Sequence, residues 1–162
     1  MTQIRVAAAQ AHPVWLDAAA TTEKILGFIQ QAADDGVQLL AFPETFLPGY
    51  PYWAMLGGLD RFNEEETKAA YAAYLEAAVG LRGPELEQIT TAARDLNIFV
   101  YLGVAERKAR SVHATLVAID PEHGIVSAHC KLMPTYGDAR SGRRGTVKDC
   151  ASMMSRACAL GG

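Results

Sequence analysis

The sequence has few cysteines, little net charge and no long apolar run, and each shortage excludes a class of protein. Its three cysteines, Cys130, Cys150 and Cys158, form an odd set without paired spacing, which predicts neither a disulfide framework nor a zinc site. The formal net charge of −3 gives no electrostatic reason to bind nucleic acid or an anionic membrane. No apolar stretch is long enough to span a bilayer.

The remaining composition is that of an ordinary globular protein. Half of the residues are hydrophobic, and 162 residues are enough for one domain with a core. The N-terminus lacks the basic segment and apolar core of a signal peptide. We therefore expect a cytoplasmic protein without a metal ion or cofactor, and with neither nucleic acid nor a membrane as its partner.

The first third of the chain has the pattern of a strand, a helix and a second strand. Residues 4–9 form a short apolar run suited to a buried strand, and Asp17 can cap a helix from about Ala18 to Ala33. Asp35 and Gly36 end that helix, and residues 37–42 form a second apolar run. This order predicts a βαβ unit with at least partly parallel pairing.

Two helices and three strands are expected after the loop at residues 43–53. Asn63 and Glu66 have the spacing of a capping box, and Gly83-Pro84 begins another helix. The strands are "IFVYLGVAE" (98–106), "SVHATLVAID" (111–120) and "IVSAHCKL" (125–132), the last two joined by the turn residues 121–124. The sequence up to Pro134 therefore indicates a layered α/β fold.

Glu44 and Lys131 are the candidate catalytic residues. Glu44 directly follows a strand and a proline, where active-site groups often lie, although it can equally cap a helix or pair with an arginine. Lys131 ends the last strand, where a lysine is usually a surface group with a partly buried stem. If the two strands bring both side chains into one pocket, the carboxylate can act as general base and the ammonium can stabilise negative charge.

Cys130 is a weaker candidate, because neighbouring side chains of a strand point to opposite faces. If Lys131 faces a pocket, Cys130 faces away from it, and we interpret Cys130 as a buried structural thiol. His113 and His129 are interpreted as packing or hydrogen-bonding groups in strands rather than metal ligands. An enzyme that uses Cys130 as its nucleophile remains a separate possibility.

Several motifs resemble the nitrilase family of carbon–nitrogen hydrolases. "GVQLLAFPETFLPGYP" (36–51) is similar to the signature around that family's catalytic glutamate, and "YLGVAER", "TLVAIDPEHGIV" and "HCKLMPTY" follow in the family's order. The continuation "PGYPYW" resembles nitrilases and cyanide-converting relatives more than amidases. The resemblance implies that residues 1–136 are a partial domain, the N-terminal half of a four-layer α-β-β-α sandwich that forms homo-oligomers.

The resemblance also implies a reaction and a set of site residues. A cysteine thiolate attacks a nitrile to form a thioimidate, which water converts to a thioester with loss of ammonia and then to a carboxylic acid. Glu44 would be the general base and Lys131 the charge-stabilising group, and Asp138 stands where the family usually has a second glutamate. Cys130 replaces a basic residue that is common before the lysine. The implied partner is a small nitrile or related substrate.

Residues 137–162 have neither strand alternation nor a helical apolar stripe, and we expect an unstructured, aberrant tail. Read with the reading frame shifted by one base from Asp138, this stretch can encode "RAVWAAGDGQGLRVHDVPGVRVGG", which resembles the family segment that precedes the nucleophile. We interpret the tail as a frameshift that leaves Cys150 and Cys158 without a role and the nitrilase inactive. The alternative is a non-catalytic module that assembles with full-length nitrilase subunits.

Overall fold

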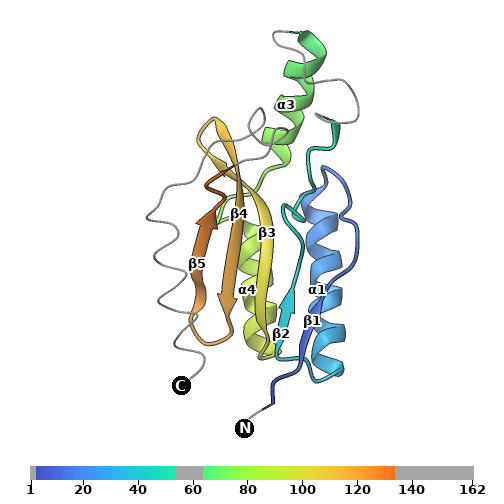
Figure 1. Ribbon diagram of the computed structural model, residues 1–162, viewed down its shortest axis with the longest axis vertical. Helices are drawn as coiled ribbons and strands as arrows, with labels where there is room; N and C mark the ends of the chain where they lie inside the picture. Colours follow the sequence, from blue (N-terminus) through green and yellow to red (C-terminus); the bar gives the residue numbers. More distant parts are fainter. Residues whose placement is uncertain (1–2, 54–63, 134–162) are drawn as a thin grey trace.

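The computed structural model describes residues 3–53 and 64–133, and five strands in these ranges form one sheet whose order follows the chain (Figure 1). β1 (Val6–Ala8), β2 (Leu39–Ala41) and β3 (Phe99–Lys108) pair in parallel. β4 (Ser111–Asp120) and β5 (Gly124–Cys130) extend the sheet in antiparallel pairs. The predicted βαβ unit and the strands that follow it are therefore present.

Helices cover one face of this sheet. α1 (Ala18–Asp34) connects β1 to β2, and the Asp17 side chain accepts a hydrogen bond from the backbone N–H of Ala20, as expected for an N-cap. α4 (Pro84–Asp95) contacts α1 and lies against β4 and β5, whereas α3 (Glu65–Ala77) extends beyond the end of the sheet (Figure 1). Within the described residues no helix combines the length and the apolar character needed to cross a bilayer.

The main core lies between these helices and the sheet. Ile29 of α1, Ile89 of α4 and Val100 of β3 are fully buried there. Alternate residues of each strand face this layer, since the side-chain period of a strand is two. Burial of these apolar side chains stabilises the fold and sets which face of each strand is turned away from the helices.

On the sheet face turned away from the helices, the predicted burial of the first strand is wrong. The apolar run at residues 4–9 predicts a buried strand, but Ile4 is 63% exposed and Val6 is 58% exposed. β1 is the edge strand, and α1 covers only the side to which Ala7 points. Apolar composition alone cannot show that one face of a strand lacks a covering layer.

A tight turn joins β4 to β5, as the residues Pro121–Gly124 predict. The Asp120 carboxylate accepts hydrogen bonds from the backbone N–H groups of Glu122 and His123 and contacts the His123 ring at 3.0 Å. Burial of Asp120 alone would raise its pKa, but these hydrogen bonds outweigh that effect and lower the pKa below its usual value of 3.8. The ionised carboxylate therefore stabilises this turn.

The start of α3 differs from the predicted capping box. The helix begins at Glu65 with Glu64 at the N-cap position, and no side chain caps it. Asn63 lies outside the described residues. The acids Glu65 and Glu66 in the first turn interact favourably with the helix dipole instead. The predicted tail at 137–162, with Asp138, Cys150 and Cys158, also lies outside the described residues.

Candidate active site

A glycine on β3 determines where Glu44 lies. The loop after β2 crosses β3 at Gly103, where a Cβ atom would lie 2.7 Å from the Glu44 Cα and closer still to the Pro43 carbonyl oxygen. Only a residue without a side chain fits beneath the loop. Backbone hydrogen bonds between Leu47 and β3 then hold the far side of the loop. The Glu44 side chain is thereby fixed over the sheet face opposite the helices.

Lys131 reaches the same place from β5. Its backbone N–H donates a 2.8 Å hydrogen bond to the Ala114 carbonyl, which continues the sheet by one residue past Cys130. Its ammonium donates to the Glu44 carboxylate, with 2.8 Å between Nζ and Oε1. The condition set by the sequence, that two distant strands bring both side chains together, is therefore met by residues 87 positions apart.

Glu44 and Lys131 share a cavity of about 390 Å³. Its wall is mostly apolar, and the residues that line it are Glu44, Gly103, Ala114, Thr115, Leu116, His129, Lys131 and Leu132. The pair remains within reach of solvent, since the Lys131 side chain is 29% exposed and the Glu44 side chain 47%. A carboxylate beside an ammonium in such a cavity can accept a proton while the ammonium stabilises an anion.

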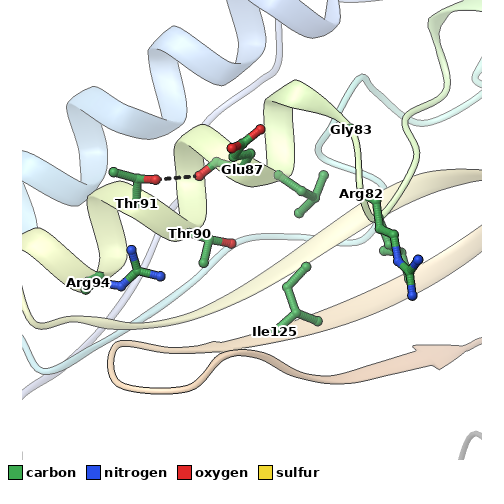
Figure 2. A pocket seen from close by; sticks show the side chains of 9 residues that line it. Arg82, Gly83, Glu87, Thr90, Thr91, Arg94 and Ile125 are labelled. Atoms are coloured by element: carbon green, nitrogen blue, oxygen red, sulfur yellow. Dashed lines mark hydrogen bonds between the residues drawn. The ribbon is translucent and has the colours of Figure 1, made fainter.

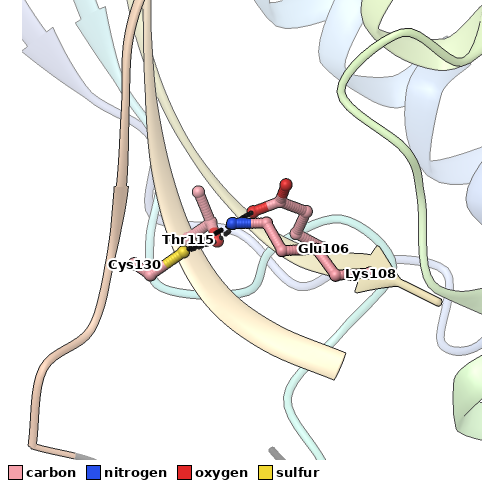
Figure 3. Close-up of polar contacts among 4 residues, drawn as sticks. All are labelled: Glu106, Lys108, Thr115 and Cys130. Atoms are coloured by element: carbon pink, nitrogen blue, oxygen red, sulfur yellow. Dashed lines mark hydrogen bonds and ion pairs between the residues drawn. The ribbon is translucent and has the colours of Figure 1, made fainter. Parts of the chain in front are cut away.

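Cys130 lies on the other side of the sheet, as strand alternation predicts. It is buried, and its Sγ lies 3.0 Å from Lys108 Nζ and 3.3 Å from Thr115 Oγ1 (Figure 3). Thr115 donates a 2.7 Å hydrogen bond to the buried Glu106 carboxylate, which also pairs with Lys108 at 3.0 Å. We call Glu106, Lys108, Thr115 and Cys130 the thiol cluster.

Sequence reasoning missed Glu106 and Lys108. Partial burial alone would lower the pKa of Lys108, but its hydrogen bonds to Cys130 and to the Glu106 carboxylate outweigh that effect and raise the pKa above 10.5. The sequence does place Glu106 and Lys108 at alternate positions near the end of an apolar strand, and side chains at alternate positions lie on the same face. Their partner could not be found without the register of β3, β4 and β5.

A second cavity, of about 380 Å³, lies between α4 and β5 on the helix side of the sheet (Figure 2). Arg82 and Arg94 lie at its two ends, and the Thr91 hydroxyl donates to the Glu87 backbone carbonyl one turn earlier in α4. This cavity contains neither Glu44 nor Lys131, and no cysteine is among its lining residues. Among the described parts of the chain, no three histidine, cysteine or acidic side chains gather as a metal site would require.

The family assignment follows from the sequence as a whole. Residues 5–153 match the model of the family described as carbon-nitrogen hydrolase. This chain belongs to the carbon-nitrogen hydrolase family. It is 40% identical to an aliphatic nitrilase of Rhodococcus rhodochrous over 136 residues, which cover 82% of the chain and 35% of that enzyme. It is 39% identical over 134 residues to a bromoxynil-specific nitrilase of Klebsiella pneumoniae subsp. ozaenae, covering 83% of the chain and 37% of that enzyme. The chain thus spans just over a third of the length of these relatives.

Solved structures of other proteins show the same fold as this chain. A CN-hydrolase superfamily protein from Xanthomonas campestris aligns with a TM-score of 0.66 at 20% identity, covering 90% of the chain and 48% of that protein. An amidase from Nesterenkonia sp. AN1 aligns with a TM-score of 0.62 at 19% identity, covering 89% of the chain and 50% of that amidase. The predicted α/β fold, half of the family's sandwich, is therefore confirmed.

Proposed function

We propose that the chain carries part of a nitrile-hydrolysing site in which Glu44 is the general base and Lys131 stabilises negative charge. In this reaction a thiolate adds to the nitrile carbon, and a first water releases ammonia and leaves a thioester. A second water releases the carboxylic acid and regenerates the thiol. Glu44 would accept protons from the thiol and the waters, and Lys131 would stabilise the anionic adducts.

The observation that supports these roles most strongly is the 2.8 Å contact between the two side chains inside an apolar cavity. An ion pair that served stability alone would gain little from this place, since exposed pairs contribute only about 0–1 kcal/mol. The relatives named as nitrilases support a nitrile rather than another carbon–nitrogen substrate. The apolar wall favours a substrate with a hydrocarbon group next to the nitrile carbon.

The nucleophile is not part of the described site. Cys130 is the cysteine within residues 3–53 and 64–133, and its thiol points into the thiol cluster, away from Glu44. We therefore propose that the 162-residue chain has no nitrilase turnover, and that Asp138 occupies the position of the second acid. We further propose that one base is lost near the codon for Asp138, and that adding it restores the segment that leads to the nucleophile.

The test begins with the DNA sequence across the codons for Thr135 to Gly162 and beyond. The 162-residue chain and the protein with the restored frame are then assayed for ammonia release from aliphatic and aromatic nitriles. We expect turnover only with the restored frame, and we expect Glu44→Gln and Lys131→Met to abolish it. Equal rates for Glu44→Gln and the unmodified restored protein would contradict the proposed roles. Turnover by the 162-residue chain that disappears in both Cys130→Ala and Cys130→Ser would instead identify Cys130 as the nucleophile, because serine keeps the polar contacts of the thiol.

A further inference from the structure

The thiol cluster holds the end of β5 to two neighbouring strands. The last paired position of β5 is Cys130 opposite Thr115 of β4, and the Cys130 thiol also contacts Lys108 of β3. Cys130 is 2% exposed, so its thiol exchanges little with solvent and depends on these partners. Its polar contacts therefore join β3, β4 and β5 through side chains at the level where β5 ends (Figure 3).

β5 ends at Cys130, and the described chain continues for three more residues. The Lys131 backbone N–H donates to the Ala114 carbonyl one residue past the end of β5, and Met133, two residues later, is 70% exposed. Consecutive side chains of a strand leave one backbone on opposite faces, so a movement of the backbone at Cys130 also moves the point from which the Lys131 side chain starts. Where the Lys131 side chain does not rotate to follow, a displacement of about 1 Å at Cys130 takes its 2.8 Å contact with Glu44 beyond hydrogen-bond distance.

We propose that Cys130 is a positioning residue that, anchored by Lys108 and Thr115, holds the Lys131 ammonium against Glu44. The proposal rests on the proposed function only for the catalytic role of Lys131. Cys130 itself takes no part in bond making, because it faces away from the cavity that the pair shares. Glu106 acts as the buried anion that keeps the Lys108 ammonium turned inward over the thiol.

The experiment measures the energetic coupling between Glu44 and Lys131 by a double-mutant cycle of Glu44→Gln and Lys131→Met. Unfolding of the 162-residue chain by urea supplies the four stabilities, and the cycle is repeated with Cys130→Ala, Cys130→Ser and Ser127→Ala present. Ser127 is the matched control, since it is buried on the same strand and its hydroxyl has no hydrogen-bond partner among residues 3–53 and 64–133. If Cys130→Ala only lowers the overall stability, it lowers the unfolding free energy of all four proteins of the cycle equally, and the coupling energy does not change.

We expect the coupling to fall to zero within error in Cys130→Ala, to return in Cys130→Ser and to stay unchanged in Ser127→Ala. An unchanged coupling in Cys130→Ala, an equal loss in Ser127→Ala, or no coupling in the unmodified chain would each overturn the proposal. If Cys130→Ala does not fold, Cys130→Val, which fills the space without a polar group, takes its place under the same criteria. Since the cycle does not measure turnover, its failure leaves nitrile hydrolysis untouched, and a missing turnover leaves the cycle interpretable.

Discussion

Replacement of Gly103 by alanine tests most directly how the fold places Glu44. The new Cβ would lie 2.7 Å from the Glu44 Cα and 2.7 Å from the Thr45 backbone nitrogen. Carbon atoms in contact are separated by about 3.5–4.0 Å, so the loop must move by about 1 Å. Backbone on both sides of the clash prevents a side-chain rotation from relieving it. Overpacking of this kind costs about 1–3 kcal/mol, and we expect Gly103→Ala to destabilise the chain by about 3 kcal/mol.

The matched control is Gly27→Ala, in the exposed part of α1, where nothing lies within 4 Å of the added Cβ. Alanine is a better helix former than glycine, and we expect this variant to be about 0.5–1 kcal/mol more stable. Urea unfolding followed by circular dichroism measures both changes. The same 1 Å shift would break the contact between Glu44 and Lys131, so their coupling should disappear in Gly103→Ala. A Gly103→Ala chain with unchanged stability and unchanged coupling would refute the reasoning.

Three further substitutions test other features of the fold. Lys108→Met leaves the buried Glu106 carboxylate without a cation and should lower the unfolding free energy by about 1–2 kcal/mol. This loss is smaller than the roughly 3–5 kcal/mol of a fully buried pair because Lys108 is half exposed. Its control is Lys68→Met, in an exposed ion pair of α3, which should leave the urea midpoint unchanged. Asp120→Asn should be less stable than the unmodified chain above about pH 5, and this difference in unfolding free energy should vanish as the pH falls through the pKa of Asp120, which lies below 3.8. A difference that stays constant down to about pH 2 would show that the charge of Asp120 is not involved. Val6→Thr should keep the unfolding free energy within about 0.5 kcal/mol, and it should reduce light scattering from aggregates because it makes an exposed apolar position polar. Val100→Thr, at a fully buried position, should lower the unfolding free energy by about 1–3 kcal/mol. Equal losses in the two variants would contradict the exposed position of Val6.

The local signals in the sequence predicted most of the fold. Asp17 caps α1 as expected, Gly36 follows its end, and the residues after Asp120 form the turn between β4 and β5. Each of these features depends on side chains and backbone within a few positions of one another. The physical rules that specify them therefore need no knowledge of the rest of the chain.

The features that the sequence could not predict depend on contacts between distant strands. The link from Lys108 to Cys130 requires the register of β3 against β4 and of β4 against β5, including the irregularity between Ala118 and Ile119. The exposed face of Val6 depends on which layers cover the sheet. Motif and position predict Glu44 and Lys131 as site residues, but they predict contact between the two side chains only if the strands bring them into one pocket. For these residues the sequence predicts the chemistry but not the neighbours.

The sheet whose spatial order equals its chain order has a consequence for how the molecule folds. The β3–β4–β5 meander joins residues close in sequence and can form early, because short loops cost little entropy to close. Lys131 belongs to this local unit, whereas Glu44 follows the parallel strands, which pair only after a helical crossover. The contact between these side chains closes 87 residues of chain. Substitutions at either residue should therefore change the unfolding rate and leave the folding rate nearly unaltered, because the two halves of the site meet after the main barrier.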